Sequence, residues 1–184
     1  MWMLRRSWQS IANSIRADSQ QKRLTFLGGG YRIFLMKITA KSRYALRMLL
    51  DIAVSGDGRP RTIKEIAASQ GISQKFISRL AVPLRRAGLL ATERGVNGGL
   101  RLSRQVGDIT LLDIVEATDG RLSLLKCLSH PGACRRQGHC AAENAWRQAN
   151  ESFARTLRSI RLSSIVEESR RISREDQAEP DYCI

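Results

Sequence analysis

The stretch TIKEIAASQGISQKFISRL, residues 62–80, decides the fold. It opens with a capping box, Thr62 followed three residues later by Glu65, which predicts a short helix. Gly71 then breaks the helical pattern, and Ser73 is a favourable N-cap for a second helix. A short helix, a glycine turn and a second helix are the arrangement of a helix-turn-helix, whose second member lies in the major groove of DNA.

The basic charge of the chain is concentrated around this motif. The whole chain has a formal net charge of +14 at pH 7. Residues 59–104 hold ten Lys or Arg and two acidic residues, a net of +8, whereas residues 105–184 have a net of −1. Such a localised excess predicts a nucleic acid as partner. The residues that lie off the apolar face near the start of the second helix, and that we expect to reach base edges, are Gln74, Lys75, Ser78 and Arg79.

A glycine-rich hairpin is predicted after the helix-turn-helix. Short apolar runs, residues 89–92 and 100–102, flank the sequence RGVNGG, residues 94–99, and read as two strands with a basic turn. A hairpin in this place is the wing of a winged helix, and Arg94 is placed to enter a narrow minor groove. The alternative is a tight hairpin whose arginine faces solvent. Further residues expected to contact DNA are Lys41, Arg43, Ser73 and Asn97.

Helices are also predicted on both sides of this region. One begins after Thr39 and ends before the glycines at residues 56 and 58, and another is capped by Thr110 and ended by Gly120. Pro83 lies inside the second helix of the motif, and we expect a kink or a split near Val82 because proline lacks an amide donor. The predicted fold class is therefore mainly α with a small β-hairpin wing: a winged helix-turn-helix plus a long dimerisation helix.

That long helix, expected within residues 142–168, carries one apolar stripe. The stripe consists of Ala142, Trp146, Ala149, Phe153, Leu157 and Ile160. A stripe of this length needs a partner, so the helix either folds back on its own chain or pairs with its twin in a symmetric dimer. A DNA-binding protein with one short recognition helix usually requires the second copy to read two half-sites.

Three of the four cysteines lie in the sequence CLSHPGACRRQGHC, residues 127–140. The segment is polar and broken by glycine and proline, so it lacks the periodicity that would bury three thiols in a core. Thiolate ligation of a soft metal is the leading interpretation. A zinc site completed by His130 or His139, or a thiol redox switch, is the alternative. A redox enzyme is less favoured because the chain has no Cys-x-x-Cys motif and no phosphate-binding glycine loop.

The chain divides into five predicted segments: a disordered extension (1–35), a winged helix-turn-helix domain (36–120), a cysteine loop (121–141), a dimerisation helix (142–168) and a disordered tail (169–184). The basic extension is faintly like a transit peptide, but an upstream extension before Met36 is the favoured interpretation. Cys183 in the tail is expected to be an unengaged thiol. No run of eighteen apolar residues occurs, so we expect a soluble, cytoplasmic protein without a membrane helix.

Several motifs together resemble the Rrf2 family of winged-helix transcriptional regulators. They are residues 37–53, the turn Gly71-Ile72-Ser73, LRRAGL at 84–89, RGVNGGLRL at 94–102 and the three-cysteine loop, in that order. The similarity runs from Met36 to about Val166. It implies a homodimeric DNA-binding repressor or activator, no enzymatic activity, and an iron–sulfur cluster of the 2Fe-2S or 4Fe-4S type held by Cys127, Cys134 and Cys140.

The sequence departs from the family pattern at the cluster. Six residues separate Cys127 from Cys134, where relatives often have five. The nitric-oxide sensor of the family takes a fourth ligand from an aspartate at the position of Arg43, and the cluster regulator takes one from a histidine at the position of Glu143. The fourth ligand therefore stays open between Glu143, His130, His139 and an external ligand. Ser78 replaces a base-reading glutamate of the cluster regulator, so the operator sequence does not transfer.

Overall fold

The computed structural model describes residues 38–55, 59–95, 98–130 and 132–178. Asn97 and Cys183 lie outside these ranges, as do the predicted extension and the end of the tail. The chain forms two compact units, Phe34–Ile172 and Met1–Ile33 with Ser173–Ile184. The first unit contains the winged helix, the cysteine loop and nearly all of the described residues. Of the second unit, only residues 173–178 are described, and they are helical.

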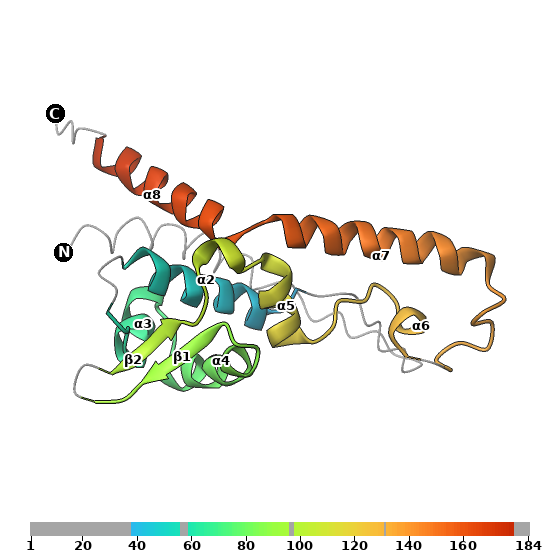
Figure 1. Ribbon diagram of the computed structural model, residues 1–184, viewed down its shortest axis with the longest axis horizontal. Coiled ribbons are helices and arrows are strands. Elements are labelled where there is room, and N and C mark those ends of the chain that lie inside the picture. The colour runs from blue at the N-terminus through green and yellow to red at the C-terminus, as the bar shows by residue number, and fades with distance from the viewer. Residues whose placement is uncertain (1–37, 56–58, 96–97, 131, 179–184) are drawn as a thin grey trace, which may run out of the picture. The chain divides into compact units, whose positions relative to one another are not determined.

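Three helices form the helix-turn-helix (Figure 1): α2 (Ala40–Val54), α3 (Ile63–Gln70) and α4 (Gln74–Arg86). The predicted capping box opens α3, since the Thr62 amide donates to Glu65 Oε2 at 2.7 Å and the Glu65 amide donates to Thr62 Oγ1 at 3.2 Å. Gly71 ends α3 with a left-handed φ of 64°, a conformation that glycine adopts without a steric penalty. The predicted motif is present, with α3 extending to Gln70.

We expected a kink or a split near Val82, and the split is wrong because helix α4 continues through Pro83 to Arg86. Leu80, Ala81 and Leu84 on both sides of the proline are buried in the core and hold the helix together. The carbonyl that loses its amide donor belongs to Arg79, an exposed residue where water is available as a donor. Packing on one face and solvent on the other make the proline tolerable.

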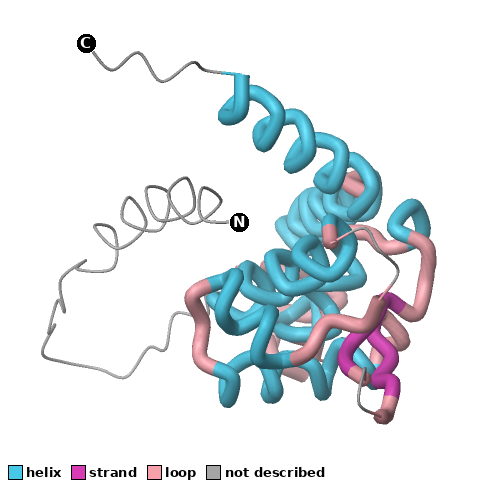
Figure 2. The backbone as a smooth tube through the Cα atoms, turned by 90° about the vertical axis from the view of Figure 1, so that its left-hand side faces the viewer, coloured by secondary structure: helices cyan, strands magenta, loops and turns pink. Residues whose placement is uncertain are grey.

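The predicted wing is an antiparallel hairpin of β1 (Leu90–Glu93) and β2 (Gly99–Leu102), with Leu90 opposite Leu102 and Glu93 opposite Gly99. Figure 2 shows both strands at one edge of the helices. Arg61 adds a third chain segment that the sequence did not predict, because its amide and carbonyl both bond to Leu100, at 2.9 and 2.8 Å. The wing is thereby joined to the segment that precedes α3.

Helix α5 (Leu111–Asp119) follows a short 3-10 turn (Val106–Asp108) and packs on α2 and α4. Its capping box is formed by Thr110 and Asp113. The core collects apolar residues from every element of the winged helix. Its largest fully buried side chains are Met48, Leu49, Ile66, Ile77, Leu84, Leu89, Ile109, Ile114 and Leu162.

The long helix differs from its prediction. It is α7 (Ala141–Ser159), and a second helix, α8 (Leu162–Ala178), begins after a break at residues 160–161. The break is extended because the Leu111 amide donates to the carbonyl of Ile160 at 2.9 Å and the Leu162 amide donates to that of Ile109 at 2.8 Å. Leu162 is fully buried. Residues 169–178 belong to α8, so the expectation of disorder is wrong for them. None of the helices in the described ranges has the length and apolarity to cross a membrane.

Candidate nucleic-acid interface and cysteine loop

The exposed side of α4 near its N-terminus is the candidate reading surface. Gln74, Lys75, Ser78 and Arg79 are all exposed there, while Ile77 between them is fully buried. Ser78 Oγ donates to the Gln74 carbonyl at 2.9 Å, which leaves its lone pairs available to accept from a base. The Ser73 side chain caps the helix by accepting from the Phe76 amide at 3.3 Å, so its predicted DNA contact would compete with the cap.

An aromatic pair without a signal in the sequence holds α4 against α2. The Tyr44 and Phe76 rings meet edge to face with centroids 5.5 Å apart, and the Arg47 guanidinium lies 5.4 Å from the Tyr44 centroid. Loss of solvation on partial burial lowers the pKa of Arg47 from its usual value. The contact between the two rings joins the start of α4 to α2.

A polar cluster around Asp51 was equally hidden in the sequence, because the residues that donate to its carboxylate lie ten to nineteen positions away from it. The Asp51 carboxylate accepts from Arg61 Nη2 at 3.0 Å, Ser69 Oγ at 2.7 Å and Gln70 Nε2 at 3.1 Å. Arg47 Nε in turn donates to Gln70 Oε1 at 3.0 Å. Since Arg61 pairs with the wing and Gln70 ends α3, this cluster fixes the wing relative to the helix-turn-helix.

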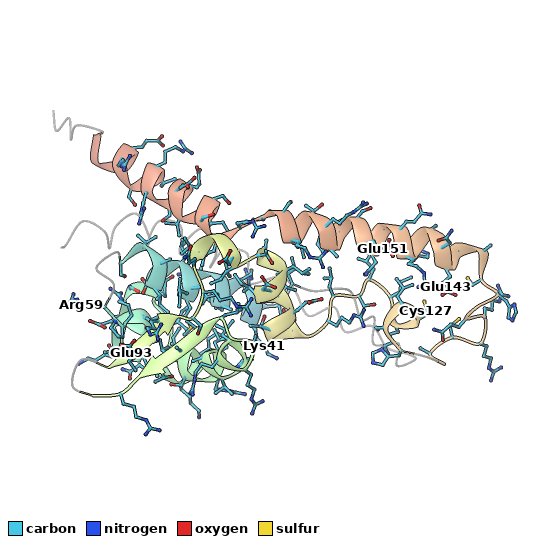
Figure 3. The ribbon with its side chains drawn as sticks, in the orientation of Figure 1. Lys41, Arg59, Glu93, Cys127, Glu143 and Glu151 are labelled. Atoms are coloured by element: carbon cyan, nitrogen blue, oxygen red, sulfur yellow. The ribbon has the colours of Figure 1, made fainter. Side chains whose placement is uncertain are left out.

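The wing presents an exposed Arg94 immediately after β1. Across the strands, Glu93 forms an ion pair with Arg101, so the acidic residue of the wing is partly neutralised. Lys41 and Arg43 are exposed in the first turn of α2 (Figure 3, where Lys41 is labelled). The described part of the predicted DNA-binding set is thus solvent-accessible, and Asn97 lies outside the described residues.

The cysteine loop lies at the N-terminal end of α7, as the labels of Cys127 and Glu143 in Figure 3 indicate. Cys127 is half-buried in the one-turn helix α6 (Lys126–Ser129), Cys134 is exposed, and Cys140 is the half-buried N-cap of α7. All three thiols are free. As unpaired soft donors within one loop, their chemistry fits a thiolate-bound metal or iron–sulfur cluster.

Side chains within the loop tie it to itself. Gln137 Nε2 donates to the Cys127 carbonyl at 3.0 Å, and Gln137 Oε1 accepts from the Gly132 amide at 2.7 Å. Among the described residues, no three His, Cys, Asp or Glu side chains are grouped as metal ligands. The structure therefore places the three cysteines in one loop without gathering them at one point.

The candidates for a fourth ligand are already engaged or exposed. Glu143 accepts from the Gly138 amide at 3.0 Å and from Arg147 Nη2 at 2.6 Å. It lies in the first turn of α7, where the helix dipole favours a negative charge. His130 Nδ1 shares a hydrogen bond of 2.8 Å with Ser129 Oγ, and His139 is exposed. His130 keeps Nε2, and His139 keeps both ring nitrogens, outside any described hydrogen bond, so either histidine could bind a metal.

Comparison with known proteins shows what these features resemble. A model of the Rrf2 family, described as iron-dependent transcriptional regulators, matches residues 38–168. Protein rrf2 of Nitratidesulfovibrio vulgaris is 35% identical over 134 residues, covering 73% of this chain and 89% of that protein. The transcriptional regulator IscR of Vibrio atlanticus is 30% identical over 149 residues, covering 81% and 86%.

Solved structures that superpose on this chain are also transcriptional regulators. The global cysteine regulator CymR of Bacillus subtilis superposes with a TM-score of 0.60 at 26% identity, covering 72% of this chain and 97% of its own. IscR of T. potens superposes with a TM-score of 0.56 at 27% identity, covering 72% and 88%. The region that the family model matches includes both the winged helix and α7.

Proposed function

The chain belongs to the Rrf2 family of transcriptional regulators, and on that premise we propose that it is a homodimeric repressor whose binding to operator DNA is controlled by an iron–sulfur cluster. The family is one of DNA-binding regulators, not of enzymes. The observation that carries the finer proposal is the presence of three free thiols, Cys127, Cys134 and Cys140, in one loop outside the core of a winged helix.

The two tasks of DNA binding are assigned to different residues. Lys41, Arg43 and the basic residues of the region 59–104 other than Lys75, Arg79 and Arg94 neutralise phosphates and make affinity depend on salt. Gln74, Lys75, Ser78 and Arg79 on α4 are placed to reach base edges, and Arg94 on the wing is placed for the minor groove. The Asp51 cluster supports this division, because it keeps the wing and the helix-turn-helix in one geometry.

The iron–sulfur cluster is assigned to Cys127, Cys134 and Cys140. Its fourth ligand is left open between His139, His130, Glu143 and an external ligand. A bound cluster would supply sensitivity to oxidants, nitric oxide and iron supply. The chain contributes a loop that joins two helices, α6 at Cys127 and α7 at Cys140, so a change at the thiols acts on both.

Dimerisation is assigned to α7. In its first nine residues, Ala141 to Ala149, every side chain except that of Glu143 is exposed, and Trp146 keeps 49% of its surface accessible. An exposed tryptophan on an amphipathic helix favours a second copy as its partner. Two copies would present two α4 helices to successive major-groove turns.

The test is spectroscopic and uses the full chain. Substituting Cys127, Cys134 or Cys140 with Ala should abolish the visible absorption and Mössbauer signal of anaerobically prepared protein. Each substitution should also change operator affinity in the same direction as chemical removal of the iron–sulfur cluster. Cys183→Ser is the matched control and should leave both properties unchanged.

Other outcomes separate the alternatives. A colourless protein that binds zinc through the same thiols would establish a zinc site, for which the exposed His139 and His130 offer imidazole ligands. If all three loop variants retain colour and regulated binding, the metal-sensor proposal is wrong and a constitutive DNA-binding protein remains.

A further inference from the structure

Asp119 is the last residue of α5, yet its carboxylate serves α2. Its two oxygens accept from three donors at the start of α2: the Thr39 amide at 3.1 Å, Thr39 Oγ1 at 2.6 Å, and Ser42 Oγ. Ser42 is buried and also shares a hydrogen bond of 3.0 Å with Thr118 Oγ1. We call these contacts between Asp119 and residues 39–42 the α2–α5 clamp.

The charges show that Asp119 is placed for α2 and not for its own helix. A carboxylate at a helix C-terminus faces the negative end of the helix dipole, and α5 has no basic residue in its last turn to offset it. Helix α2 has the opposite defect, because its first turn has no acidic residue and carries Lys41 and Arg43 at the positive end. Asp119 supplies from outside the carboxylate that α2 lacks.

The clamp therefore sets the position of two proposed phosphate contacts. Thr39 Oγ1 donates to Asp119 and at the same time accepts from the Lys41 amide at 3.1 Å, so the cap of α2 depends on the clamp. Lys41 and Arg43 leave the same turn and are exposed. Asp119 acts on DNA through these residues and does not need to touch DNA itself.

The chain between Asp119 and Cys127 is fastened at several points. Gly120 and Leu122 donate their amides to the carbonyl and side chain of Glu116, at 3.1 and 3.2 Å. Leu122 is buried against α5 and α7, and the Leu124 amide donates to Asn150 Oδ1 on α7 at 2.9 Å. These contacts hold residues 120–124 against α5 and α7, and two residues separate this fastened segment from Cys127.

We propose that the α2–α5 clamp is the positioning contact through which the state of the cysteine loop reaches the DNA-binding surface. The inference rests on the proposed function for the existence of cluster control, and it adds the route. Loss of the clamp loosens the first turn of α2, moves Lys41 and Arg43, and disconnects operator affinity from the loop.

The experiment compares Asp119→Asn with Asp108→Asn, which removes the same charge from an exposed residue of the 3-10 turn. Operator affinity is measured by fluorescence anisotropy for protein with and without its cluster. For Asp119→Asn we expect about fivefold weaker binding, the size of one helix-terminus charge interaction. We also expect the operator affinities measured with and without the cluster to become nearly equal, so that their ratio approaches one. Asp108→Asn should keep the wild-type ratio. A wild-type ratio retained by Asp119→Asn overturns the proposal.

A second measurement is independent of the cluster. Hydrogen–deuterium exchange of cluster-free Asp119→Asn should be faster both in the first turn of α2 and in residues 120–125, by roughly tenfold for a clamp of this strength. Ser42→Ala should show a smaller change at the same amides, and the double variant should be no worse than Asp119→Asn alone. If wild-type protein binds the operator equally tightly with and without its cluster, the proposed control by the cluster is wrong. The exchange pattern alone then tests whether the clamp connects α2 to residues 120–125. If exchange becomes faster in α2 but stays unchanged in residues 120–125, Asp119 makes only a local contact and the proposal is overturned.

Discussion

At the scale of single residues, Gly99 shows how closely the wing is packed. A Cβ at this position would lie 2.6 Å from the Arg61 carbonyl oxygen and 2.7 Å from its carbon, both backbone atoms that pairing with Leu100 holds in place. We predict that Gly99→Ala costs about 1–3 kcal/mol of unfolding free energy, the range for forced overpacking.

Urea unfolding followed by circular dichroism measures this cost. Gly107→Ala is the matched control, because a Cβ there would meet nothing within 4 Å. Equal stabilities of the two variants would show that the Arg61–Leu100 pairing yields more easily than the structure indicates.

At the scale of elements, the capping box of α3 predicts a pH dependence. Hydrogen bonds from the Thr62 backbone and side chain hold the pKa of Glu65 below its ordinary value of 4.5. A lowered carboxyl pKa stabilises the fold above the ordinary value, and this contribution is lost as the pH falls through the folded-state pKa. Thr62→Ala should cost about 1 kcal/mol near neutral pH, a typical N-cap loss.

The same substitution should also flatten the pH dependence of stability below pH 4.5, because Glu65 then loses its hydrogen bond from the Thr62 side chain. Thermal melts of both proteins across this range are the measurement. Thr92→Ala, which removes an exposed threonine from β1, is the control and should keep the wild-type profile. Parallel profiles for Thr62→Ala and the wild type would remove the capping box as their cause.

At the scale of the whole molecule, the exposed part of α7 is the proposed dimer contact. Leu157 near its C-terminus is buried against α5, whereas Trp146 is 49% exposed. We predict that Trp146→Asp converts the proposed dimer into monomers and weakens operator binding, because each half-site is then bound separately.

Sedimentation equilibrium and anisotropy titrations provide the measurements for this prediction. Gln148→Asp introduces the same charge about half a turn away on the same helix and should leave the dimer intact. A Trp146→Asp protein that remains dimeric would place the dimer contact elsewhere in the chain.

The sequence by itself determined the winged helix and its family, because each local signal agreed with the next. The capping box at Thr62, the turn at Gly71, the cap at Ser73 and the glycine-rich hairpin are short-range devices whose chemistry is readable from neighbouring residues. The same is true of the exposed residues at the start of α4 and of the grouping of three cysteines in one loop.

The tertiary structure alone decided what depends on contacts between distant segments. Pro83 stays helical because the core holds both sides of it, and the stripe of α7 is cut at Ile160 because the carbonyl of that residue accepts from the amide of Leu111 at the start of α5. Asp51 and Asp119 carry no local motif, since their partners lie up to 19 and 80 residues away. Local chemistry specifies helices and turns, but which helix a carboxylate serves is settled only when the chain has folded.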